Sequence, residues 1–114
     1  MIFLDSSALV KRYIKEIGTD HVNAIFSSSP LMAASKLAYP EILSAFMRKR
    51  RADELSRSLL HSVMNKFEND WTSFFVIELS DEVLRPAKRI IEKYALKAAD
   101  AVHLASASWL KSST

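Results

Sequence analysis

The chain has 114 residues, of which 49% are hydrophobic and 25% charged, a composition that predicts one soluble globular domain over residues 1–114. It contains no cysteine, which excludes disulfides and thiolate chemistry and fits a reducing, cytoplasmic location. The net charge of +3 permits a polyanionic partner without requiring one, and no apolar run predicts a membrane span or a signal peptide.

Short apolar runs alternate with helical patterns along the chain. Met1–Leu4 predicts a buried strand, and Ser6 or Ser7 can cap a helix whose apolar spacing continues to Ile17, with Gly18 closing it. The remaining predicted elements are, in order, a helix over Thr19–Ser27, a strand over Leu31–Ser35, helices over Ala38–Arg51 and Asp53–Asp70, a strand over Phe74–Leu79, a helix capped by Ser80 that runs to Tyr94, and a helix over Ala98–Lys111. Strands separated by helices predict an α/β fold with a parallel sheet covered on both faces.

Three carboxylates stand where these elements begin or end. Asp5 follows the first strand, Glu41 lies in the first turn of a helix after Pro40, and Asp100 lies in the first turn of the last helix. Each has a local explanation, because a carboxylate at a helix N-terminus caps free N–H groups and is favoured by the helix dipole. Taken alone, Asp5 is most simply explained as a helix cap.

The surroundings of these acids favour a second interpretation. Glu41 and Asp100 are flanked by apolar residues, where an unpaired carboxylate is costly. Sites in parallel sheets form outside the carboxyl ends of the strands. If the three acids meet at that edge, protons or a cation must neutralise them. Oxygen ligands suit Mg²⁺ or Mn²⁺.

Three segments of the sequence, FLDSSALVKRY, YPEILSAF and LKAADAVHLASA, resemble the acidic motifs of PIN-domain nucleases, particularly the VapC-like toxins of toxin–antitoxin pairs. The resemblance covers essentially the whole chain and implies a PIN-like three-layer α/β/α fold. It implies that Asp5, Glu41 and Asp100 are catalytic and bind one or two Mg²⁺ or Mn²⁺ ions, with Ser6 and Ser7 supporting the first acid. The implied reaction is hydrolysis of an RNA phosphodiester by metal-activated water, and the implied protein partner is an antitoxin.

Basic residues are candidates for contacts with RNA. Lys11 and Arg12 on the first helix, together with the run Arg48–Arg51, have the side chains that most often contact phosphates. The simpler explanation of the run is a solvated helix C-terminus, where cations are favoured. His103 lies one helical turn after Asp100, but a histidine at such a position is more often a core or surface residue than part of a site.

The sequence departs from the family pattern at its end. Family members continue beyond the ADAVHLASA helix with another parallel strand that ends in a fourth acid, whereas this sequence ends at Thr114. We therefore expect about three strands, a site of three carboxylates, and an open first-strand edge that pairs with another chain to form a homodimer or higher oligomer. One alternative is a degenerate PIN module that binds an antitoxin or dimer partner and cuts nothing. Another is a small α/β interaction domain whose acids bind no metal.

Overall fold

A three-stranded parallel sheet forms the centre of the molecule. The computed structural model describes residues 1–28 and 31–114. Strands β1 (Ile2–Phe3), β2 (Met32–Ser35) and β3 (Phe75–Ile77) lie in the order β1-β2-β3, with Ile2 opposite Met32 and Ala33 opposite Phe75. Parallel neighbours need a crossover between them, and helices provide both crossovers.

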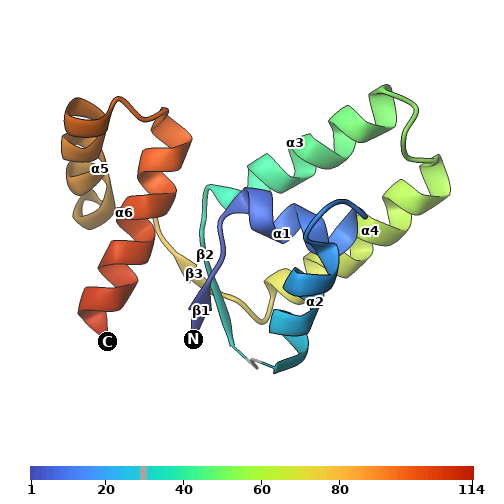
Figure 1. The fold of residues 1–114 in the computed structure, drawn as a ribbon, viewed down its shortest axis with the longest axis horizontal. Helices are drawn as coiled ribbons and strands as arrows, with labels where there is room; N and C mark the ends of the chain where they lie inside the picture. Colours follow the sequence, from blue (N-terminus) through green and yellow to red (C-terminus); the bar gives the residue numbers. More distant parts are fainter. Residues whose placement is uncertain (29–30) are drawn as a thin grey trace.

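Helices cover the two faces of this sheet. They are α1 (Ser6–Tyr13), α2 (Thr19–Ser28), α3 (Ala38–Arg51), α4 (Arg57–Trp71), α5 (Asp81–Tyr94) and α6 (Ala98–Ser113). Figure 1 shows α1 to α4 on one side of the strands and α5 with α6 on the other. The α/β class and the three layers are therefore as predicted. Over residues 1–28 and 31–114, no helix is long and apolar enough to cross a bilayer.

Strand β2 contributes to two separate cores because its side chains alternate between the faces of the sheet. All four of its residues are buried. Met32 and Ala34 belong to the core beneath α1, α3 and α4, whereas Ala33 belongs to the core beneath α5 and α6. This double burial explains why the first three residues of the strand are all apolar.

Helix α1 is shorter than predicted. It ends at Tyr13, after which Ile14 is extended, and the side chain of Ile17 is 94% exposed. The backbone N–H of Glu16 donates to the Thr19 hydroxyl at 2.9 Å, which stabilises a turn in place of further helix. The prediction that the helix continues to Ile17 is wrong. Gly18, with φ of +96°, belongs to the turn that leads into α2.

Helix α4 begins later than predicted. Asp53 has a left-handed φ of 61° and lies in the connection, while the Ser56 hydroxyl caps the helix by accepting from the N–H of Leu59 at 3.2 Å. The predicted start at Asp53 is therefore wrong. On the helix itself the Phe67 side chain is buried, whereas the Leu59 side chain is 55% exposed.

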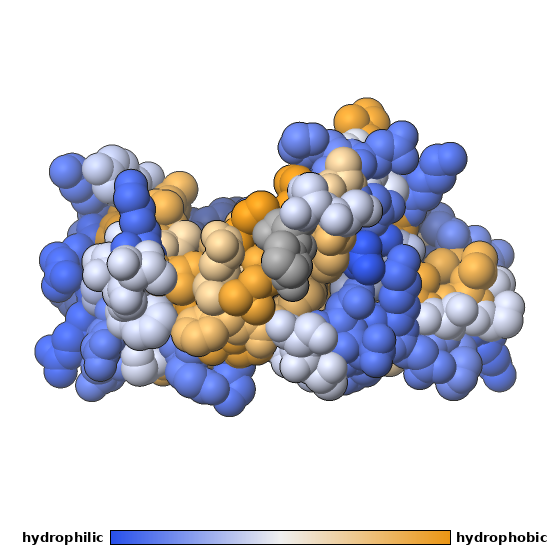
Figure 2. Space-filling model, turned by 90° about the horizontal axis from the view of Figure 1, so that it is seen from below, coloured by the Kyte–Doolittle hydropathy of each residue, from blue (hydrophilic) through white to orange (hydrophobic). Residues whose placement is uncertain are grey.

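Apolar side chains also gather at the amino end of the sheet. Figure 2 looks at the molecule from below the view of Figure 1 and shows them near the centre of this face, between hydrophilic ends. Met1 and Leu31, which directly precede β1 and β2, are 54% and 41% exposed. The three predicted metal ligands, Asp5, Glu41 and Asp100, lie towards the opposite, carboxyl end of these strands.

Candidate active site

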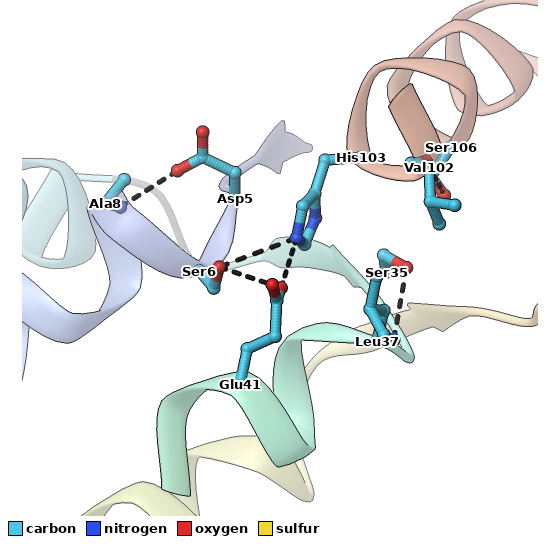
Figure 3. Close-up of polar contacts among 9 residues, drawn as sticks. All are labelled: Asp5, Ser6, Ala8, Ser35, Leu37, Glu41, Val102, His103 and Ser106. Carbon is cyan, nitrogen blue, oxygen red and sulfur yellow. Dashed lines mark hydrogen bonds and ion pairs between the residues drawn. The ribbon is translucent and has the colours of Figure 1, made fainter. Parts of the chain in front are cut away.

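Three helices meet at the carboxyl end of the sheet through one group of polar side chains. Ser6 begins α1 directly after β1, Glu41 lies in the first turn of α3 after β2, and His103 lies on α6. The Ser6 hydroxyl donates to Glu41 Oε1 at 2.9 Å, and His103 Nε2 lies 2.5 Å from the same oxygen. Figure 3 shows the three side chains converging from their separate helices. This contact joins the two helical layers.

The hydrogen bonds of Ser6, Glu41 and His103 define their roles. An ionised carboxylate can only accept hydrogen bonds, so the Ser6 hydroxyl and Nε2 of His103 both act as donors to Oε1. Nδ1 is buried and has no partner among the described residues. A serine hydrolase instead needs a histidine that accepts the serine proton on one nitrogen and donates to the acid from the other. The arrangement therefore does not activate Ser6 as a nucleophile.

Asp5 caps a helix and also lines a cleft. Its Oδ1 accepts from the N–H of Ala8 at 2.9 Å, so Asp5, rather than Ser6 or Ser7, caps α1. Figure 3 shows its carboxylate directed towards Ala8. Asp5 and Asp100, which is exposed in the first turn of α6, line one cleft of about 540 Å³. The other residues of this cleft are Phe3, Leu4, Ala8, Leu96, His103, Leu104 and Ala107.

A larger cleft of about 880 Å³ lies between α1 and α3. Ser7, Lys11 and Glu41 contribute to its lining. Lys11 Nζ donates to the Ile17 carbonyl at 2.9 Å and lies 3.4 Å from a carboxylate oxygen of Glu16. Lys11 therefore reaches the cleft with its charge already partly compensated.

Arg12 lies apart from both clefts and stabilises the helical layer. Its Nε donates to Asp70 Oδ2 at 2.8 Å, and its guanidinium lies 3.9 Å from the centre of the Phe26 ring. The hydroxyl of Tyr13 donates to the same Asp70 oxygen at 2.8 Å. Burial, reinforced by this carboxylate, raises the pKa of Tyr13 far above its ordinary value. These contacts give Arg12 a role in packing α1 against α4 and α2.

The three predicted metal ligands are not gathered into one compact group. Across residues 1–28 and 31–114, no three acidic or histidine side chains lie close enough together to form a metal cage. Asp5 and Asp100 share the smaller cleft, whereas Glu41 lines the larger one. Among the described atoms, Asp5 Oδ2, Glu41 Oε2 and both carboxylate oxygens of Asp100 accept no hydrogen bond.

Curated relatives share the sequence over almost its whole length. Ribonucleases VapC45 and VapC49, from two strains of Mycobacterium tuberculosis, are each 34% identical to it over 107 residues, which cover 94% of this chain and 74% of the relative. The chain belongs to the VapC family. No family model matches the chain.

Solved structures of toxins share the fold. A toxin–antitoxin complex from Klebsiella pneumoniae superposes with a TM-score of 0.69 at 16% identity, covering 96% of this chain and 79% of that one. VapC20 of M. tuberculosis, a toxin that cleaves the sarcin–ricin loop, gives a TM-score of 0.69 at 14% identity over 92% of this chain and 79% of its own. The resemblance to VapC-like PIN domains is thus confirmed for the family and the fold.

The carboxylates of this VapC chain fit a hard divalent cation. Mg²⁺ commonly keeps several waters and is bound through one or two carboxylates together with substrate phosphates. Asp5 and Asp100 offer such a pair in one cleft, each with at least one oxygen that has no partner among the described residues. With oxygen donors only, Mg²⁺ and Mn²⁺ fit better than thiophilic metals.

His103 was not among the predicted site residues, although it is the side chain that connects α6 to Glu41. One signal for it was present in the sequence. Residues three apart on a helix share a face, so His103 lies on the same face as Asp100. What the sequence does not indicate is that the ring reaches across to a carboxylate on α3.

Proposed function

We propose that this VapC chain is an endoribonuclease that hydrolyses RNA phosphodiesters with Mg²⁺ or Mn²⁺. The observation that carries the proposal is the pairing of Asp5 and Asp100 in one cleft, in a chain whose relatives are named as ribonucleases. When bound, the divalent ion supplies Lewis-acid activation of water and neutralises the charge of the phosphate.

The side chains of the protein hold and orient the participants in this reaction. Asp5 and Asp100 would hold the ion, and Oδ2 of Asp5 is available for this because Oδ1 caps α1. Glu41 is the third carboxylate of the site and is oriented by the Ser6 hydroxyl. Ser7 and Lys11, which line the neighbouring cleft, contribute polar contacts to the RNA. Arg12 contributes indirectly, by supporting α1.

The proposed partners follow from the same relatives. A neighbour in fold is a toxin–antitoxin complex, and we propose that this chain also binds an antitoxin protein, in the cytoplasm. Strand β1 has one neighbouring strand, β2, in the described part of the chain. Because an open strand edge is a template for pairing, we propose a homodimer or higher oligomer formed through β1.

A second candidate is a VapC module that binds its antitoxin or dimer partner without cutting RNA. The separation of Glu41 from the other two acids favours it, since no compact group of three ligands lies in the described part of the chain. The two candidates differ in one measurable property, which is metal-dependent cleavage.

The substitution Asp5→Asn tests the proposed activity. Asparagine is as good a helix cap as aspartate, so this variant keeps α1 and loses the charge. With Mn²⁺ and single-stranded RNA of mixed sequence, we expect the cleavage rate to fall by at least about 100-fold, the effect of removing one charge-stabilising group from an active site.

Asp20→Asn is the matched control, because Asp20 is also exposed in the first turn of a helix, α2. It should cleave at the wild-type rate. Equal rates in wild type and Asp5→Asn, or no cleavage by the wild type with Mn²⁺ present, would contradict the proposed activity. The latter result would favour the binding module.

A further inference from the structure

The Glu41 carboxylate is held from two sides through a single oxygen. Ser6 and His103 both bond to Oε1, at 2.9 and 2.5 Å, while Oε2 has no partner among the described residues. The Glu41 side chain is 30% exposed, so without these bonds it would be free to turn into solvent. Two bonds to one oxygen fix the plane of the carboxylate and leave the other oxygen available.

Of the two groups that bond to Oε1, His103 is the more firmly fixed. Its side chain is only 8% exposed, and it lies on α6 beside the buried residues Ala105 and Ser106. Ser6 is half-buried at the first position of α1. The imidazole therefore restrains Glu41 from a buried position on α6, which lies in the layer opposite to α3.

The same histidine also borders the cleft of the other two acids. His103 lines the 540 Å³ cleft together with Asp5 and Asp100 while its Nε2 contacts Glu41 beside the larger cleft. It is thus the link between the separated carboxylate and the cleft proposed to hold the cation. Groups that hydrogen-bond to a ligating carboxylate typically change metal affinity by about 10- to 100-fold when they are removed.

We propose that His103 is a positioning residue that holds Glu41 by Oε1 and thereby keeps Oε2 available to the cation site of Asp5 and Asp100. This inference rests on the proposed metal-dependent function and adds a residue to it. The imidazole itself binds neither the ion nor the RNA. Its contribution is to join α6 to α3 and to keep the third carboxylate in one orientation.

Two amide substitutions of His103 separate positioning from general packing. In His103→Gln the side-chain amide reaches about as far as Nε2 and can still donate to Glu41, whereas in His103→Asn it reaches only as far as Nδ1. Mn²⁺ affinity, measured from the free-ion signal in electron paramagnetic resonance, should fall by about 10- to 100-fold in His103→Asn. It should stay within about threefold of wild type in His103→Gln, since the hydrogen bond is retained.

Controls keep the outcome interpretable. His61→Asn changes an exposed histidine on α4 and should leave Mn²⁺ affinity unchanged. Circular dichroism and thermal unfolding establish that each variant is folded. If His103→Asn does not fold, His103→Met fills a similar volume without a donor and should show the same loss of Mn²⁺ affinity.

The outcomes distinguish this inference from the function on which it rests. If wild type binds Mn²⁺ and folded His103→Asn binds it equally well, or if His103→Gln loses as much affinity as His103→Asn, the positioning role is overturned while the proposed function stands. If wild type binds no Mn²⁺, both are overturned.

Discussion

The two faces of the sheet are packed with different kinds of side chain. Beneath α1, α3 and α4 the core is aromatic, with Tyr13, Phe46 and Phe67 in edge contacts whose ring centres lie 5.6 to 6.0 Å apart. Beneath α5 and α6 the core consists largely of small side chains. Its buried members are Ala33, Ile77, Val83, Ala87, Ala101, Ala105 and Leu110.

This difference teaches how the site is assembled. Small side chains allow backbones to approach closely, and Ala101 and Ala105 of α6 pack in one core with Ala33 of β2. Asp100 and His103 lie in the first two turns of α6. The close packing of α6 on the sheet therefore places Asp100 near the start of α1 and His103 against α3. We call the core beneath α1, α3 and α4 the aromatic face and the core beneath α5 and α6 the alanine face. We infer that the aromatic face supplies most of the packing stability, whereas the alanine face determines the geometry of the site.

The largest expected effect comes from the aromatic face. Phe67 is fully buried, and its ring contacts those of Tyr13, Phe46 and Tyr39. Phe67→Ala should lower the free energy of unfolding by about 3–5 kcal/mol, because it removes apolar surface and leaves a cavity. Urea denaturation measures this loss.

Leu59→Ala on the same helix is the control for Phe67→Ala. Leu59 is 55% exposed, and its truncation should change the free energy of unfolding by no more than about 0.5 kcal/mol. Similar losses in the two variants would contradict the account of the aromatic core.

A substitution on the alanine face should lower the free energy of unfolding by less, but it should also weaken Mn²⁺ binding. Ala105→Leu places a larger side chain where Ala105 is 1% exposed, which should lower the free energy of unfolding by about 1–3 kcal/mol through overpacking. Because the helix must move away from β2, Mn²⁺ affinity should fall as well.

Ser108→Leu inserts the same side chain on the exposed side of α6 and should change neither property. If folded Ala105→Leu retains wild-type Mn²⁺ affinity, the packing of α6 does not determine the geometry of the site, and the proposed difference between the two faces is contradicted.

Elements with strong local signals were predictable from the sequence. Helix α3 runs over Ala38–Arg51 as predicted, because Pro40 suits a first helical turn and the apolar spacing is regular. The end of α1 was not predictable from spacing alone. Ile14 and Ile17 continue the helical period, yet side-chain to backbone bonds around Thr19 stabilise a turn there instead.

The grouping of the predicted acids was only partly predictable from the sequence. Asp5, Glu41 and Asp100 were predicted to meet at the carboxyl end of the sheet, but Asp5 and Asp100 line one cleft whereas Glu41 lines the other. The engagement of Glu41 by His103 was not predicted, because it depends on how closely α6 approaches α3 across the layers. Similarly, the pairing of Arg12 with Asp70 joins residues far apart in the sequence and could not be read from the basic charge alone.

The central claim is that Asp5, which caps α1, and Asp100 of α6 together hold a divalent cation between the opposite layers. A Mn²⁺ titration by isothermal calorimetry of wild type and Asp100→Asn tests it most directly, with Asp81→Asn as control because Asp81 is an exposed first-turn acid on the neighbouring α5. We predict that Asp100→Asn weakens Mn²⁺ binding by at least about tenfold while Asp81→Asn binds like wild type. No binding heat in wild type, or equal affinity in wild type and Asp100→Asn, would contradict the claim.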